Sequence, residues 1–188
     1  MTADAMLDTP IANDASAQTM AIILAAGRGS RMQSDQPKVL LPALGRPLVA
    51  HVIDALLATG IQKIVLVVGH QQELVKTELN EFSNLIFVTQ LEQLGTGHAV
   101  QMCGTQLKQH SGPVLVVTGD SPLIQPESIK SLLAEFQAIQ ASCILGSLHH
   151  DNPAGLGRIV RDPQGNFPGI VEQKDATATQ QNITEVNM

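Results

Sequence analysis

The sequence predicts an α/β protein built on a mostly parallel sheet with helices on both faces. Two observations lead to this prediction. Short apolar runs, of the length expected for strands buried on both faces, alternate with amphipathic segments of helix length. The alternation holds from residue 20 to residue 140, and strand–helix–strand units of this kind bring parallel strands side by side.

The predicted elements follow one another in the order β-α-β-α-β-α-β-α. We expect strands at residues 20–25, 63–69, 85–90 and 112–120. We expect helices at residues 47–60, 71–82, 95–109 and 126–140. Pro126 suits the first turn of the last helix, whereas Gly104 in its interior weakens the third.

The pattern changes after residue 140. Strand-like pieces separated by Gly, Pro and Asn lie at residues 142–149, 157–162 and 167–173, and the final "ITEVNM" resembles the start of another strand. Two interpretations stay open for these pieces. They are strands added at the edge of the sheet, or they form a β-rich flap over a site.

The composition excludes several classes of protein. A net charge of −6 and the absence of Trp and Tyr argue against a nucleic-acid binder, which needs a basic face and stacking platforms. No apolar run approaches the roughly 20 residues of a membrane span, so no membrane partner is expected. Cys103 and Cys143 are far apart and lack metal-ligand spacing, which favours a reducing cytoplasm over a disulfide framework or a zinc site.

The first nineteen residues differ from the rest of the chain. They carry three Asp, no Lys or Arg and no long apolar block, so they match neither a signal peptide nor a transit peptide. We expect residues 1–19 to be a disordered leader, with Met20 opening the fold.

A basic cluster follows the first predicted strand. Four of the eleven Lys and Arg residues lie within nineteen positions, at Arg28, Arg31, Lys38 and Arg46. The segment "LAAGRGSRM" is neither a dinucleotide fingerprint nor a Walker A loop, because the required third glycine and the Gly-Lys-Ser/Thr run are missing. It is a glycine turn at the carboxyl end of a strand, suited to phosphate groups, or an ordinary turn with solvated charges.

Two further strand ends carry polar residues. Asp120, in "VVTGDSPL", is placed to hold Mg²⁺ against phosphate oxygens, or it is a turn residue. In "QLEQLGTGHA", Gln90 has the donor and acceptor for a two-point contact with a base edge, and Gly95 and Thr96 begin a helix; a surface Gln with a Thr cap is the alternative. The six histidines show no ligand spacing, and we expect them to be structural or exposed.

Taken together, these motifs resemble the sugar-1-phosphate nucleotidyltransferases. The resemblance is strongest to the uridylyltransferase domain of the bacterial bifunctional N-acetylglucosamine-1-phosphate uridylyltransferase/glucosamine-1-phosphate acetyltransferases. It rests on "LAAGRGSRM" with "PKVL" downstream, "EQLGTGHA", "GDSPL", "NPAGLGRIV", "GIVEQKDA" and "EVN", in the family's order. It implies the three-layer, Rossmann-like fold of the nucleotide-diphospho-sugar transferases.

The resemblance also implies a role for particular residues. Those lining the nucleotide and its base would be Leu24, Ala25, Ala26, Gly27, Lys38, Gln90, Gly95 and Thr96. Arg31 and Lys38 would be catalytic and contact the phosphates, and Asp120 would hold Mg²⁺. Gly157, Glu172 and Asn187 would bind the N-acetylglucosamine moiety.

The implied reaction transfers a uridylyl group from UTP to N-acetylglucosamine 1-phosphate, giving UDP-N-acetylglucosamine and pyrophosphate. Transfer involving another sugar or nucleotide, and a non-catalytic nucleotide-binding module, stay open as alternatives. In the family, the domain continues to an Asn that is a second metal ligand, and then to hexapeptide repeats that carry acetyltransferase activity and trimerisation. Residues 20–188 are therefore expected to be a nucleotidyltransferase domain that is incomplete at its C-terminal end, and a homotrimer is expected only with those repeats.

Overall fold

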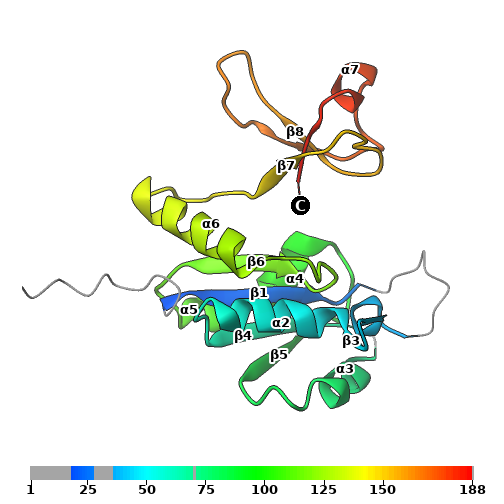
Figure 1. Ribbon diagram of the computed structural model, residues 1–188, viewed down its shortest axis with the longest axis vertical. Coiled ribbons are helices and arrows are strands. Elements are labelled where there is room, and N and C mark those ends of the chain that lie inside the picture. Colours follow the sequence, from blue (N-terminus) through cyan, green and yellow to red (C-terminus); the bar gives the residue numbers. More distant parts are fainter. Residues whose placement is uncertain (1–17, 28–35, 70, 188) are drawn as a thin grey trace, which may run out of the picture. The chain divides into compact units, whose positions relative to one another are not determined.

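The computed structural model of the chain describes residues 18–27, 36–69 and 71–187 (Figure 1). The chain divides into two compact units, Met1–Gln137 and Ala138–Met188. Each has its own sheet, and each is described separately below.

The first unit is built on four parallel strands: β1 (Met20–Ala25), β4 (Lys63–Val68), β5 (Leu85–Thr89) and β6 (Val114–Thr118). Their order across the sheet is β5-β4-β1-β6. The chain therefore builds outward from β1 through β4 to β5, and then crosses to the other side of β1 for β6. All four strands were predicted, because each contains a continuous apolar run; the central strands β1 and β4 are largely buried, whereas the edge strands β5 and β6 are partly exposed.

Helices cover both faces of this sheet, as predicted. On one face, α2 (Leu48–Ala58), α3 (Gln72–Glu78) and α6 (Pro126–Ala138) pack against alternate strand residues such as Ala21 and Ile23. On the other face, α4 (Thr96–Met102) and α5 (Gly104–Lys108) contribute Ala99, Cys103 and Leu107 to a smaller cluster with Met20 and Ile22. The period-2 alternation of β1 thus divides its side chains between two cores.

Two predicted helices differ from the expectation. The third is divided at Cys103, whose φ of −81° and ψ of 14° interrupt the helical backbone just before Gly104. The second ends at Glu78, because Leu79 departs from helical geometry at φ −103° and ψ 18°. Both breaks shorten the helices without changing the faces that they cover.

A small hairpin precedes α2 and was not predicted. Strands β2 (Pro42–Ala43) and β3 (Arg46–Pro47) are joined by Leu44 and Gly45, both with positive φ, as in a tight two-residue turn. Helix α2 consequently begins at Leu48 rather than Pro47. Arg46 forms ion pairs with Asp54 of α2 and, at 3.4 Å, with Glu81, so this cation of the basic cluster has a structural partner.

The second unit contains an antiparallel sheet of its own, in the order β7-β10-β8-β9. Its strands are β7 (Ser147–His149), β8 (Arg158–Val160), β9 (Gly169–Val171) and β10 (Glu185–Asn187). The expectation that these pieces extend the parallel sheet is wrong, since among the described strands they pair only with one another. The short helix α7 (Ala178–Gln181) was also missed, although a capping box formed by Thr177 and Gln180 begins it.

Glu185 of β10 connects β7 to the residue that follows β8. Its carboxylate accepts hydrogen bonds from Arg161 Nε at 2.8 Å, Arg161 Nη2 at 2.7 Å and Ser147 Oγ at 2.8 Å. The hydrogen bonds from Arg161, followed by that from Ser147, lower the pKa of Glu185 to about 2. The carboxylate therefore stays ionised through ordinary acidic conditions.

Among the described residues, no helix is both long enough and apolar enough to cross a bilayer.

We predict that replacement of Glu185 by Gln lowers the stability of the second unit and makes that stability less dependent on pH in the acid range. A carboxyl whose pKa is lower in the folded state than in the unfolded state stabilises the fold above its unfolded pKa. For Glu185 this stabilisation is lost as the pH falls from about 4.5 toward about 2. Thermal unfolding of wild type between pH 7 and pH 3 is expected to show a larger fall in Tm than Glu185→Gln shows. Asp151→Asn, at an exposed carboxylate of the same unit, serves as the control, and equal falls in wild type and Glu185→Gln would contradict the prediction.

Candidate functional site

The candidate site in the first unit lies at the carboxyl ends of β1 and β6. The chain order reverses here, because β4 and β6 flank β1 on opposite sides. Open α/β sheets bind ligands at such a switch point, where the loops diverge and leave a crevice. The Gly119 amide nitrogen donates to the Leu24 carbonyl oxygen at 2.9 Å, which ties the two strand ends together.

Lys38 and Asp120 meet at this edge of the sheet. Lys38 Nζ lies 2.5 Å from Asp120 Oδ2, and the two side chains are 40% and 31% exposed. The 3-10 helix η2 (Lys38–Leu40) positions Lys38, since its other two residues, Val39 and Leu40, are buried in the core. The pair joins residues 82 positions apart, so the fold brings together two of the predicted site residues.

The environment of Asp120 keeps its carboxyl ionised. Burial acts to raise the pKa of Asp120, but the hydrogen bond and charge of Lys38, helped by a hydrogen bond from Thr118, hold it below the ordinary value. An ionised carboxylate beside phosphate groups needs a cation to offset the repulsion. Lys38 supplies that cation in the free protein.

Asp120 offers the kind of ligand that Mg²⁺ prefers. A carboxylate oxygen is a hard donor, and Mg²⁺ is commonly held by one or two carboxylates together with substrate phosphates. No three His, Cys, Asp or Glu side chains converge to hold a metal ion in residues 18–27, 36–69 and 71–187. Among these residues, Asp120 offers one carboxylate ligand of the kind that such an ion takes together with phosphate oxygens.

The segment from Leu24 to Gly27 presents mainly its backbone. Ala25 and Ala26 are 4% and 7% exposed, so their side chains belong to the core, whereas Gly27 is exposed. Two contacts hold the end of this segment. Gln93 Nε2 donates to the Ala26 carbonyl oxygen at 2.5 Å, and a Cβ at Gly69 would lie only 2.7 Å from the same oxygen. The backbone at Ala26 is thus clamped between two neighbouring loops.

The structure also brings Gln90 and Gly95 together, at the end of β5. Gln90 is 4% exposed, and its Nε2 lies 3.2 Å from the Gly95 carbonyl oxygen and 2.9 Å from His98 Nδ1. Gly95 has φ +101°, a conformation that side chains rarely adopt, and Thr96 begins α4 beside it. The contact with His98 is one that the sequence did not reveal.

In the second unit, Gly157, Glu172 and Asn187 lie in one row across three strands. Arg158 pairs with both Val171 and Val186, so the preceding residue, Gly157, lies between Glu172 and Asn187. The Asn187 amide nitrogen donates to the Gly157 carbonyl oxygen at 3.2 Å. Cross-strand neighbours point to the same face, so the side chains of Glu172 and Asn187 flank the glycine.

Gly157 has no room for a side chain. A Cβ there would lie 2.5 Å from Asn187 Oδ1 and 2.8 Å from Ile170 Cγ2. The Asn187 amide occupies the space that the glycine leaves, and Glu172 is exposed at the other side of the row. The three residues named for the sugar are therefore neighbours in space.

A buried arginine supports this row and was not recognised from the sequence. Arg158 is 1% exposed, and its guanidinium donates to the Leu156 carbonyl oxygen, to Gln173 Oε1 at 2.7 Å and to the Gln181 carbonyl oxygen at 3.4 Å. Gln173 Oε1 also accepts from the Gly155 amide nitrogen at 3.1 Å. The arginine thereby connects the loop before Gly157 to the segment after Glu172 and to α7.

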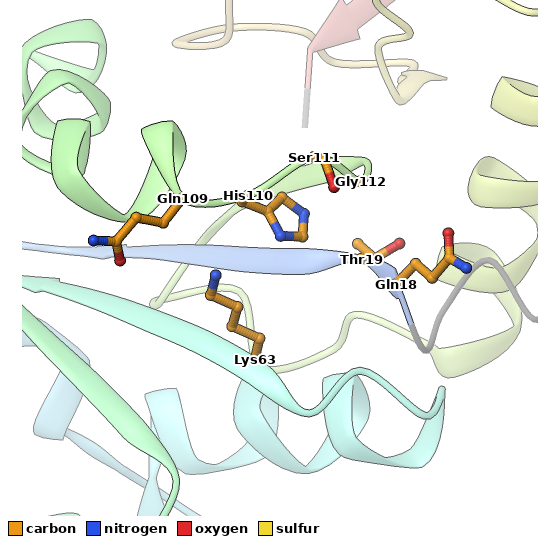
Figure 2. A pocket seen from close by; sticks show the side chains of 7 residues that line it. All are labelled: Gln18, Thr19, Lys63, Gln109, His110, Ser111 and Gly112. Atoms are coloured by element: carbon orange, nitrogen blue, oxygen red, sulfur yellow. The ribbon is translucent and has the colours of Figure 1, made fainter.

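Arg28 and Arg31 of the predicted site lie outside the described residues. A separate hollow of about 330 Å³ lies near the amino ends of β1 and β4, lined by polar side chains that include Lys63, Gln109 and His110 (Figure 2). Parallel strands place their amino and carboxyl ends at opposite edges of the sheet. This hollow is therefore distinct from the site at Gly27 and Asp120.

Most of the chain matches the model of a known protein family. Residues 21–163 match the MobA-like NTP transferase domain, which is most of the chain. The chain belongs to this NTP transferase family. The prediction of a nucleotidyltransferase is thus confirmed at the level of the family.

Relatives within the NTP transferase family include the bifunctional protein GlmU of several bacteria. The GlmU of Geobacillus sp. strain WCH70 is 48% identical over 167 residues, which cover 89% of this chain and 36% of that protein. The GlmU of Enterococcus faecalis is 44% identical over 167 residues, with coverages of 89% and 36%. The chain therefore spans about a third of the length of these relatives.

Solved structures of other nucleotide enzymes share the fold. A UDP-glucose pyrophosphorylase complexed with UDP-glucose superposes with a TM-score of 0.72 at 18% identity, covering 90% of this chain and 74% of that one. HddC from Yersinia pseudotuberculosis, complexed with GMP-PN, has a TM-score of 0.63 at 21% identity, with coverages of 81% and 68%. These likenesses confirm the predicted fold class.

We predict that Gly69→Ala displaces the Ala26 backbone. The added Cβ would meet the Ala26 carbonyl oxygen at 2.7 Å, and overpacking of this kind costs about 2 kcal/mol in the free energy of unfolding. Urea unfolding measures the loss. Gly104→Ala, where nothing lies within 4 Å of the new Cβ, is the matched control and is expected to be neutral or slightly stabilising. Equal stability of the two variants would contradict the clamp.

Proposed function

We propose that the chain transfers a uridylyl group from UTP to N-acetylglucosamine 1-phosphate, forming UDP-N-acetylglucosamine and pyrophosphate. The observation that carries the proposal is the Lys38–Asp120 pair at the switch point of the sheet, a cation and a carboxylate suited to Mg²⁺ and phosphate. The identity of 41–48% to proteins named GlmU supports the choice of reaction. Because the chain covers only 36% of the first of those relatives, the activity of the relatives is assigned to this chain as a proposal.

In the proposed reaction, an oxygen of the sugar phosphate attacks the α-phosphorus of UTP in line, and pyrophosphate leaves. Two anions must approach one another, so the chain's main task is to position them and to offset their charge. Asp120 would hold Mg²⁺, which neutralises phosphate oxygens when bound. Lys38 would bind phosphate oxygens near the reacting centre, and Arg31 would act with it.

The remaining contacts with UTP would come from two loops. The backbone from Leu24 to Gly27 would lie along the nucleotide, which agrees with the burial of the Ala25 and Ala26 side chains. Gln90 and Gly95 would read the base, with Thr96 beside them. The hydrogen bond between Gln90 and Gly95 supports their acting together.

The sugar would be bound by the row in the second unit. Glu172 carries acceptors for sugar hydroxyl groups, and the Asn187 amide carries both donors and acceptors. Gly157 would leave space for the Asn187 amide, as its geometry indicates.

We also propose a cytoplasmic location, supported by the two free cysteines. A homotrimer is proposed only where a hexapeptide-repeat domain accompanies this one.

Replacement of Asp120 by Asn tests the catalytic proposal. We expect a fall in turnover of roughly 100-fold, since one lost electrostatic contact in such a site costs about 3 kcal/mol in the barrier. The measurement is pyrophosphate release from UTP and N-acetylglucosamine 1-phosphate with Mg²⁺. Glu135→Gln, at an exposed carboxylate on α6, is the control and should retain wild-type turnover.

Three outcomes would count against this proposal. Unchanged turnover in Asp120→Asn would remove Asp120 from the reaction. Binding of both substrates by the wild type without pyrophosphate release would instead indicate a nucleotide-binding module. A donor panel in which CTP or GTP replaced UTP as the preferred nucleotide would overturn the assignment of Gln90.

Replacement of Gly157 by Ala tests the sugar site. The new Cβ would displace the Asn187 amide, so we expect the KM for N-acetylglucosamine 1-phosphate to rise roughly tenfold while the KM for UTP stays near its wild-type value. Gly169→Ala is the matched control, because nothing lies within 4 Å of a Cβ at that position in the same sheet. Equal KM values in the two variants would contradict the role of Gly157.

A further inference from the structure

The side-chain amide nitrogen of Gln90 has two hydrogen-bond partners. This nitrogen, Nε2, lies 3.2 Å from the Gly95 carbonyl oxygen and 2.9 Å from His98 Nδ1. An amide nitrogen carries two hydrogens, so these partners use both. The Gln90 backbone is held as well, since its amide nitrogen donates to the Val68 carbonyl oxygen at 2.8 Å.

The Gly95 carbonyl oxygen fixes which end of the amide faces these two partners, and His98 reinforces that orientation. The Gly95 carbonyl oxygen can only accept hydrogen bonds, and it also accepts from the Ala99 amide nitrogen at 3.1 Å. His98 Nδ1 must carry a lone pair to accept from Gln90, which places the imidazole hydrogen on Nε2. A rotated amide would set its oxygen against the Gly95 carbonyl oxygen and, with the imidazole hydrogen on Nε2, against the Nδ1 lone pair as well, so Gln90 Oε1 is directed away from both.

A base that meets Gln90 Oε1 meets a hydrogen-bond acceptor. The N3 position of uracil carries a hydrogen and can donate to this oxygen. The N3 position of cytosine carries a lone pair and would be repelled by it. An orientation that leaves a wrong partner unpaired is an effective source of discrimination.

We propose that His98 is a positioning residue for donor choice, which strengthens the selection of UTP over CTP by reinforcing the orientation of the Gln90 amide. This inference rests on the proposed function, in which Gln90 reads the base. His98 contacts the amide that reads the base and not the base itself, so its effect is on nucleotide preference. Without the imidazole acceptor, only the Gly95 carbonyl oxygen would orient the amide.

Two substitutions separate the acceptor from the bulk of the ring. His98→Asn keeps an acceptor near the position of Nδ1, whereas His98→Leu keeps similar bulk without any acceptor. Calorimetric titration of the full chain with UTP and with CTP, in the presence of Mg²⁺, gives the ratio of the two Kd values. We expect His98→Leu to lower the preference for UTP roughly five- to tenfold, as loss of one hydrogen bond would, and His98→Asn to keep it.

The outcomes distinguish this inference from the proposed function. If the wild type binds neither nucleotide, the proposed function fails. If it prefers UTP and His98→Leu keeps that preference, or if His98→Asn loses it as fully as His98→Leu, only the role of His98 is overturned.

A second measurement needs no nucleotide and no stable Leu variant. Long-range ¹H–¹⁵N correlation spectra of the wild type report the tautomer of each histidine, and loss of a signal in His98→Asn assigns His98. The hydrogen is expected on Nε2. A hydrogen on Nδ1 would remove the acceptor and overturn the inference.

Discussion

The position of β1 between β4 and β6 is the constraint on which the candidate site depends. Because β4 and β6 both run parallel to β1, the loops that follow these three strands all begin at the same edge of the sheet. The glycine segment after β1 and Asp120 after β6 become neighbours for this reason. The hydrogen bond from Gly119 to Leu24 sets their spacing.

Opposite charges complete the arrangement at this edge. Lys38 compensates Asp120 in the free protein, at a place where the backbone of Gly27 is open and the side chains of Ala25 and Ala26 are buried. In the proposed reaction, a phosphate group bound at this edge would share Lys38 with Asp120. That competition would favour an additional cation at Asp120, as a metal-assisted phosphate reaction requires.

The sequence predicted the parallel sheet well, because each of β1, β4, β5 and β6 contains an uninterrupted apolar run, although only the central strands β1 and β4 are largely buried. It did not predict the hairpin at residues 42–47 or helix α7, since elements of two to four residues have no periodicity to detect. The burial of Arg158 was not predicted, because charged residues are seldom buried. The carbonyl oxygens that accept hydrogen bonds from its guanidinium make this burial possible. The residues of the site could be named by resemblance, but contacts such as that of His98 with Gln90 depend on distances that only the fold determines.

The hydrogen bond from Gln93 to Ala26 links two loops that would otherwise move separately. One loop carries Gln90, and the other is the turn that leaves β1. When one of these loops becomes ordered, the other loses part of its conformational freedom as well. The entropy cost of ordering the two loops is therefore smaller than the sum of the two separate costs. In the proposed function, a base bound at Gln90 would therefore also reduce the freedom of the Ala26 backbone just after β1.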